Sequence, residues 1–318
     1  MNIWFGQQLP APLSPSAVTI GNFDGVHTGH RHILQRLARE AQARQLHSVA
    51  IIFEPQPNEF FSRQANRPLP QRITPLRDKI QLLQQTGSVN SVWVQRFNPQ
   101  FAAQAAEQFI QTILREQLNT RYLLIGDDFR FGKGRGGDFS LLDAQRDFET
   151  ERTPSILISG ERASSTAIRQ ALQTGDVAAA NQMLGHPYTL SGHVKHGKKL
   201  GRTIGCPTAN VHLPLHRYPL SGVFVVRATG SFGECAGVAS FGTNPTVSHT
   251  PEAKLEVHLF DFSGCLYGER IQVTFLHKLR DETKFDSIAA LQTQIAQDIE
   301  TARAWHQAHR DAEAACGA

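Results

Sequence analysis

A glycine-rich segment near the start of the chain combines two histidines with a turn sequence. The segment GNFDGVHTGH, residues 21–30, holds three glycines, and His27 and His30 lie three positions apart. Residues three apart share one face of a helix, so both imidazoles can point at one ligand. Free N–H groups at a helix start bind phosphate, and glycines let the backbone approach it closely. The spacing therefore favours a phosphate site in which both histidines donate hydrogen bonds to developing negative charge.

Two other interpretations of this histidine pair stay open. A zinc site needs a third ligand, and neither a cysteine nor an acidic pair lies close enough in sequence to complete a zinc set. His32 is near in sequence but projects elsewhere on a helix. The pair could also be structural, with one ring capping the helix and the other on the surface.

A second group of glycines and cations lies in HGKKLGRTIGCPTAN, residues 196–210. Residues 192–198 fit most of a P-loop, but Lys199 stands where a magnesium-binding hydroxyl belongs, and later glycines and a proline prevent a helix start. We therefore reject a P-loop. Thr208 and Asn210 alternate onto one side of an extended chain, and their oxygens suit Mg²⁺. A polar turn is the competing interpretation.

Hydrophobic periodicity predicts the elements that must position the histidines. Continuous apolar runs predict buried strands at 17–20, 48–53, 91–94 and 122–125. Helices are expected at 30–45, from Thr74-Pro75 onward, at 99–118, and as a pair broken at Gly175. The alternation predicts an α/β doubly wound parallel sheet, in which ligands sit at the carboxyl ends of the strands.

The pattern changes from Tyr188 onward. Strand-like segments at 222–229, 255–262 and 270–277 are separated by turn residues and predict an antiparallel β-barrel. Residues 287–309 predict an amphipathic C-terminal helix. We place the domain boundary near Gly185, which gives domains 1–185 and 186–318.

Composition and charge limit the class of protein. The chain has 318 residues, of which 40% are hydrophobic and 19% charged, so a folded core is expected. A net charge of +4 suits anionic small molecules and does not require nucleic acid. Four widely spaced cysteines favour reduced thiols, and no signal peptide or membrane helix is recognisable. We expect a soluble cytoplasmic protein without nucleic-acid or membrane partners; its oligomeric state stays open.

The first segment resembles the (T/G)xFDGxHxGH signature of the HxGH nucleotidyltransferases, which transfer a nucleoside monophosphate and release pyrophosphate. These enzymes carry a second phosphate motif at a helix start, matched here by SSTAIR, residues 164–169. Alone, its hydroxyls would be an ordinary cap; beside the first motif they suit triphosphate oxygens. The residues that this resemblance assigns to the nucleotide are Gly21, Asn22, Phe23, Asp24, Gly29, Ser165, Thr166 and Arg169.

The second segment resembles the GKxxGRxxGxPTAN motif of riboflavin kinases. Further matches follow in order: GTNPT (242–246), LEVH (255–258), LYG (266–268) and LRDETKF (279–285). With the HxGH signature in front, the chain resembles the bifunctional bacterial riboflavin kinases and FAD synthetases from about Ile20 to Ile299. The resemblance implies phosphorylation of riboflavin to FMN in the second domain and adenylylation of FMN to FAD in the first. The implied partners are riboflavin, FMN and ATP, with Mg²⁺ as cofactor.

The resemblance also implies individual roles. Glu256 would be the base at the ribityl hydroxyl, although a solvated outer strand face would also explain a carboxylate there, and Thr208 and Asn210 would hold Mg²⁺. The transferase half needs no base, because an FMN phosphate is already ionised at neutral pH. The remaining implied nucleotide contacts are Gly197, Lys198, Gly201 and Arg202. The implied flavin contacts are Asp128, Phe129, Phe131, Arg280 and Phe285, although either of the first two phenylalanines could be plain core.

Three positions depart from the family pattern: Gln56 replaces a histidine, Asp128 an asparagine and Cys265 an aspartate. Gln56 excludes acid–base chemistry at its position, and the effects of the other two stay open.

Other functions also stay open. They are a flavin- or nucleotide-binding regulator without turnover, and an HxGH transferase for another phosphate ester with the barrel as a ligand sensor. RNA binding rests only on the positive charge and the barrel, and lacks a series of stacking aromatics.

Overall fold

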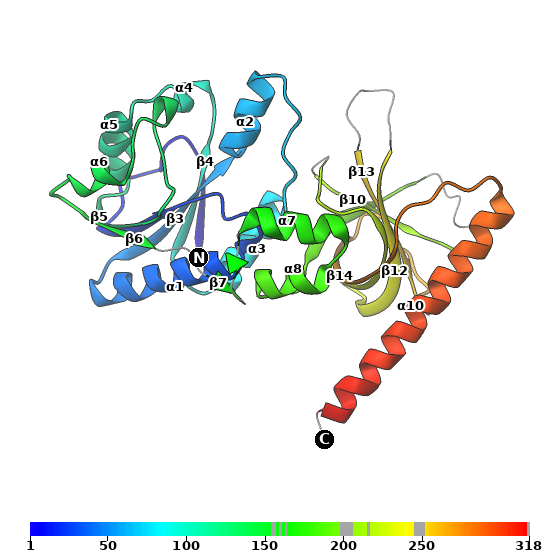
Figure 1. The fold of residues 1–318 in the computed structure, drawn as a ribbon. Coiled ribbons are helices and arrows are strands. Elements are labelled where there is room, and N and C mark those ends of the chain that lie inside the picture. Colours follow the sequence, from blue (N-terminus) through cyan, green and yellow to red (C-terminus); the bar gives the residue numbers. More distant parts are fainter. Residues whose placement is uncertain are drawn as a thin grey trace. The chain divides into compact units, whose positions relative to one another are not determined.

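The structure is a computed structural model that describes residues 1–153, 157–158, 161–162, 164–197, 206–214, 217–244 and 252–316. The chain forms two compact units, each described here by itself (Figure 1). One comprises residues 1–70 and 76–165, and the other residues 71–75 and 166–318. The assignment of the two activities to residues before and after 185 remains a prediction.

The first unit is built on a parallel sheet in the order β1-β4-β3-β2-β5-β6. Its strands are β1 (Asn2–Gly6), β2 (Ser16–Ile20), β3 (His47–Glu54), β4 (Ser91–Arg96), β5 (Thr120–Gly126) and β6 (Glu149–Thr153). The predicted doubly wound sheet is confirmed. Both edge strands, β1 and β6, escaped prediction: the apolar run of β1 is only three residues long and partly exposed, and β6 has no apolar run.

Two apolar cores, one on each face of this sheet, are formed with the helices of the unit. These helices are η1 (Asp24–Val26), α1 (Thr28–Ala43), α2 (Pro57–Gln64), α3 (Leu76–Gln85), α4 (Pro99–Ala102), α5 (Ala106–Phe109), the π-helix η2 (Ile110–Gln117), η3 (Lys133–Arg135) and α6 (Phe139–Asp143). Successive residues of β2 face opposite cores: Ala17 packs in the cluster that includes Leu34 and Leu37 of α1, whereas Val18 and Ile20 pack with residues of α5 and η2. Burial of both faces explains why the central strands read as unbroken apolar runs.

The helix predicted over 99–118 is interrupted. Ala105 takes an extended conformation between α4 and α5 (φ −63°, ψ 157°). A distant loop packs into the gap: Lys133 N donates to Gln104 O at 2.8 Å, and a Cβ on Gly132 would lie 2.8 Å from Ala106 Cα. The break is therefore set by a tertiary contact that local periodicity does not contain.

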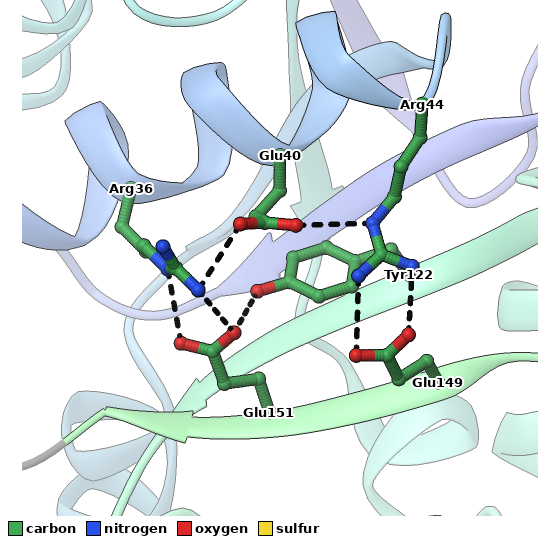
Figure 2. Close-up of polar contacts among 6 residues, drawn as sticks. All are labelled: Arg36, Glu40, Arg44, Tyr122, Glu149 and Glu151. Carbon is green, nitrogen blue, oxygen red and sulfur yellow. Dashed lines mark hydrogen bonds and ion pairs between the residues drawn. The ribbon is translucent and has the colours of Figure 1, made fainter.

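A network of charged side chains ties α1 to the edge strand β6. Figure 2 shows its members: Arg36, Glu40, Arg44, Tyr122, Glu149 and Glu151. Arg36 donates two hydrogen bonds of 3.1 Å to Glu151, and Arg44 donates two of 2.7 and 3.1 Å to Glu149. Glu40 pairs with both arginines from within the helix, and the Tyr122 hydroxyl donates to Glu151 at 2.5 Å. The network holds a short edge strand that buries little apolar surface.

This network predicts acid-sensitive stability. Hydrogen bonds from Arg36 hold the pKa of Glu151 below its usual value, with a further contribution from Tyr122. A carboxylate with a depressed folded pKa stabilises the fold above its unfolded pKa of about 4.3, and loses this contribution as pH falls through the folded pKa. We expect Glu151→Gln to cost about 1 kcal/mol at pH 7, a fall in Tm of roughly 2–4 °C, and less near pH 3.

Thermal melts at several pH values check this expectation. Glu116→Gln is a suitable control, because Glu116 contacts only Gln111 on the surface of η2 among the described interactions. A Glu151→Gln deficit that stays constant down to pH 3 would contradict the linkage.

The second unit is a closed antiparallel barrel in the order β10-β13-β12-β11-β14-β9, as predicted. Its strands are β9 (Thr189–Lys195), β10 (Ala209–His212), β11 (Gly222–Gly230), β12 (Gly233–Asn244), β13 (Glu252–Leu259) and β14 (Arg270–Arg280). Alternate residues such as Leu255 and Val257 fill its core. The C-terminal helix α10 (Ile288–Cys316) runs beyond its predicted end at 309 and packs through Ala302 and Trp305 against a separate cluster that includes Val223 and Val225.

Two helices precede the barrel strands and share the barrel core. They are α7 (Ser165–Thr174) and α8 (Val177–Leu184), separated at Gly175 (φ 84°) as predicted. Their apolar residues belong to the same buried cluster as the barrel interior. A further short hairpin consists of β7 (Leu157–Ile158) and β8 (Glu161–Arg162). Within the described residues, no helix is both long and apolar enough to cross a membrane.

Candidate functional site

The two signature histidines meet where β2 turns into α1. Phe23 and Gly25 take positive φ values of 46° and 81°, which turn the chain into η1. His27 then caps α1, because its Nδ1 accepts from His30 N at 3.4 Å. The two rings stack with centroids 3.6 Å apart. The structure thus brings the predicted pair together, and His27 also has the capping role of the structural interpretation.

His30 carries no charge at neutral pH in the free protein. Burial holds its pKa well below the usual value, and the nearby charges of His27 and Lys79 lower it further. Its Nδ1 is buried with no hydrogen-bond partner among the described residues. An incoming anion would therefore find a neutral N–H donor, and its negative charge would favour protonation of the ring. No group of three or more His, Cys, Asp or Glu side chains in the described part of the chain is arranged to hold a metal ion.

Lys79 is a site candidate that the sequence analysis did not single out. It lies on α3, which packs against η1, and its side chain is fully buried. Its positive charge acts on His30. Lysines are almost never fully buried unless they are paired or functional. One signal was present in the sequence: Lys79 falls between Leu76 and Leu83 on the apolar face of α3, where a hydrophobic residue is expected.

The second phosphate motif is divided between the two units. Ser165 begins α7 as predicted, and its Oγ donates to Asp24 O of the signature turn at 3.3 Å, within the first unit. Thr166 and Arg169 belong to the second unit, where Arg169 Nε donates to Gln71 O at 2.8 Å. Within the first unit, the structure therefore brings Ser165 to the histidine turn.

The two candidate flavin-facing phenylalanines of the first unit have different environments. Phe129 and Phe131 stack at 5.6 Å with an angle of 15°. Phe131 is buried in the sheet core beside Phe109, so its role as plain core is accounted for. Phe129 is only partly buried, and Asp128 beside it is exposed. Phe129 and Asp128 are thus the members of this group that a ligand can reach.

The candidate kinase base lies on β13 with its neighbours in register. Glu256 pairs with Asn210 on β10 and with Ser240 on β12. Because Leu255 and Val257 fill the barrel interior, Glu256 projects from the opposite strand face, as predicted. Its Oε2 lies 2.8 Å from Lys254 Nζ. The structure thus brings the predicted base to the predicted magnesium ligand.

The glycine-rich loop is described only at its two ends. Gly197 lies against Asn210 so closely that an added Cβ would stand 2.6 Å from Asn210 Oδ1. Thr208 is half-buried two residues before Asn210. The predicted nucleotide contacts Lys198, Gly201 and Arg202 lie outside the described residues.

Arg280 is held by the C-terminal helix. Its guanidinium donates to Asp298 at 2.9 Å (Nε to Oδ1) and 2.8 Å (Nη2 to Oδ2), and it lies 5.8 Å from the centre of the Phe285 ring. Arg280 and Phe285 are therefore neighbours, as the prediction requires. The remaining guanidinium nitrogen, Arg280 Nη1, donates to Asp281 O at 2.9 Å, where the loop after β14 begins.

Two of the three departures from the family pattern have clear environments. Gln56 is buried, its backbone N donates to Glu59 Oε2 at 3.1 Å, and it precedes α2 as the N-cap residue. Cys265 is exposed in the turn between β13 and β14. The glutamine thus occupies a buried helix-start position.

Comparisons with known proteins agree with this geometry. Residues 9–167 match the family model described as FAD synthetase, and residues 184–306 match the one described as riboflavin kinase. The chain is 46% identical over 298 residues to a bifunctional riboflavin kinase/FMN adenylyltransferase of Escherichia coli (strain K12), covering 92% of this chain and 93% of the relative. It is 44% identical over 297 residues to one of Haemophilus influenzae, covering 92% and 95%.

A solved structure extends the likeness to three dimensions. A crystal structure described as a macrolide-efflux protein from Streptococcus pneumoniae matches with a TM-score of 0.78 and 31% identity, over 94% of this chain and 98% of the other. The name of that structure, including the word efflux, applies to that protein and not to this chain. The parallel sheet and the barrel, with the family models that match them, define a nucleotidyltransferase unit joined to a kinase unit. The chain belongs to the family of bifunctional riboflavin kinase/FMN adenylyltransferases.

Proposed function

We propose that this chain converts riboflavin to FMN and then FMN to FAD, with ATP as the co-substrate of both steps. The kinase step is assigned to residues 186–318 and the adenylyl transfer, which releases pyrophosphate, to residues 1–185. The observation that supports the kinase assignment most directly is the register of Glu256 with Asn210 on neighbouring strands. Both reactions are placed in the cytoplasm, where ATP is abundant.

In the kinase step, the ribityl 5′-oxygen of riboflavin attacks the γ-phosphorus of ATP. The new O–P bond forms as the bond to the β,γ-bridging oxygen breaks, and ADP leaves with that electron pair. The hydroxyl proton goes to the Glu256 carboxylate, the base beside the reacting groups. Thr208 and Asn210 offer half-buried oxygen donors, which fits Mg²⁺. When bound, this ion would neutralise charge on the ATP phosphates.

In the transferase step, an FMN phosphate oxygen attacks the α-phosphorus of ATP and pyrophosphate leaves. The nucleophile is already an anion near neutral pH, so positioning and charge stabilisation suffice. His30 supplies a neutral N–H donor, His27 stacks on it, and the buried ammonium of Lys79 adds fixed positive charge. These groups stabilise the negative charge that builds on the phosphates.

The other proposed contacts follow from the motifs. In the first unit the nucleotide contacts are Gly21, Asn22, Phe23, Asp24, Gly29 and Ser165, and in the second unit Thr166 and Arg169. For the kinase nucleotide they are Gly197, Lys198, Gly201 and Arg202. For the flavins they are Asp128, Phe129, Phe131, Arg280 and Phe285.

One time course tests the proposal. Purified protein is mixed with riboflavin, ATP and Mg²⁺, and riboflavin, FMN and FAD are separated chromatographically. We expect FMN first and FAD afterwards. FMN that accumulates without FAD would mean that the first unit serves another phosphate ester. Flavin binding without any turnover would mean a regulator.

Gly197→Ala is expected to damage the kinase step selectively. The added Cβ would overlap the Asn210 side chain and displace it from Glu256. Because displacement by about 1 Å can cost roughly 100-fold in rate, we expect FMN formation to fall by about 10- to 100-fold. FAD formation from supplied FMN, measured on the same preparation, is the control. Equal loss of both activities would instead point to misfolding.

A further inference from the structure

Lys254 is a charged residue that neither the motifs nor the proposed mechanism uses. It lies two positions before Glu256 on β13, so both side chains project from the same strand face. Lys254 Nζ lies 2.8 Å from Glu256 Oε2, and the two side chains are 42% and 30% exposed. The ion pair is therefore accessible to a ligand and occupies one oxygen of the proposed base.

A second carboxylate borders the same ammonium. Lys254 pairs in register with Gly242 on β12, and a Cβ on Gly242 would collide with the Glu282 carboxylate. The positive charge of Lys254 also acts on Glu282. Lys254 thus lies between two carboxylates. Asn210 lies opposite Glu256 on the neighbouring strand β10.

This arrangement poses a chemical problem for the base. Glu256 Oε2 is held by the Lys254 ammonium at 2.8 Å, so this oxygen is not open to the ribityl hydroxyl while the ion pair persists. An incoming phosphate carries more negative charge than a carboxylate, and lysine is a flexible point charge that can change partners. Binding of the triphosphate can therefore draw the ammonium away and release the base.

We propose that Lys254 is a catalytic residue of the kinase step. Its ammonium pairs with Glu256 in the free protein and moves to the transferring phosphoryl group when ATP binds. Glu256 is then free to accept the hydroxyl proton, and Lys254 stabilises charge on the phosphoryl oxygens without taking part in the proton transfer. This inference rests on the proposed kinase function of the second unit.

Steady-state kinetics of the full-length protein test the proposal. Lys254→Met is expected to lower kcat for FMN formation by about 100- to 1,000-fold, the usual effect of one lost donor to developing charge. KM for riboflavin and FAD formation from supplied FMN should stay within about twofold. Lys254→Arg should retain more activity than Lys254→Met, because it keeps the charge.

The same substitution in a Glu256→Gln protein distinguishes two roles of Lys254. In one, Lys254 contacts the phosphoryl group; in the other, it only positions Glu256. If Lys254 touches the phosphoryl group, Lys254→Met lowers the residual rate of the Glu256→Gln protein further. If it only holds Glu256, the second substitution changes nothing and the proposal is overturned. Arg227→Met is the matched control, because Arg227 pairs with Glu234 on the same barrel with comparable exposure, and its rate should stay within about twofold.

The remaining outcomes are also decisive. A Lys254→Met protein with kcat within about twofold of wild type overturns the proposal. So does loss of the folded barrel in both Lys254→Met and Lys254→Gln, because Lys254 would then serve stability. If the wild-type protein makes no FMN, the proposed kinase function itself is wrong. This measurement alone distinguishes that result from a failure of the Lys254 proposal.

Discussion

His30→Ala is expected to abolish FAD formation while FMN formation continues. The substitution removes a buried, neutral imidazole whose N–H is proposed to meet negative charge on the reacting phosphates. Loss of one such donor typically costs 100- to 1,000-fold, and we expect at least about 100-fold in kcat for FMN adenylylation. The fold should survive, because the helix cap is provided by His27 and needs only the backbone N–H of residue 30.

The measurement is FAD production from supplied FMN and ATP, followed together with FMN production from riboflavin. His32→Ala is the matched control: His32 is exposed on the same helix, and both activities should remain. A His30→Ala protein that still makes FAD at more than about a tenth of the wild-type rate would remove His30 from the mechanism. Loss of both activities together would indicate a folding defect.

Glu256→Gln is expected to have the opposite effect: FMN formation falls, while FMN-to-FAD conversion continues. The amide keeps the size of the side chain but cannot take the hydroxyl proton. General-base catalysis typically contributes 100- to 10,000-fold, so we expect FMN formation to fall by at least about 100-fold. FMN-to-FAD conversion should not change, because an FMN phosphate that is already ionised needs no base.

Glu234→Gln provides the control for this experiment. Glu234 is an ion-paired glutamate on the same barrel, away from the Asn210 row, and its neutralisation should leave both steps intact. A Glu256→Gln protein that phosphorylates riboflavin at a near-normal rate would exclude Glu256 as the base and leave it as a solvated strand residue.

Much of the fold follows from local sequence. The central strands β2 to β5 are apolar on both faces because helices cover both, and that pattern is visible in the sequence. The edge strand β6 shows no such pattern in the sequence, because it is held by the charged network with α1 rather than by apolar burial. The break at Ala105 depends on a loop near Gly132 that is distant in sequence.

The candidate sites divide in the same way. The histidine pair and the Glu256–Asn210 row were predictable, because helical spacing and strand alternation fix which side chains share a face. The sequence only hints at Lys79, through its place on the apolar face of α3, and does not single out Lys254. The significance of these residues depends on burial in one case and on a neighbour's role in the other. Distances between elements decide both, and a sequence pattern contains none.

The shared core of α7, α8 and the barrel bears on attempts to separate the two activities genetically. Ile168, Leu172 and Leu184 are buried among barrel residues, so a fragment cut at residue 185 would carry two helices stripped of their packing partner. A fragment cut before Thr166 would keep the histidine turn but lose Arg169. Separation of the two activities would therefore either expose the apolar faces of α7 and α8 or remove the proposed nucleotide contact Arg169.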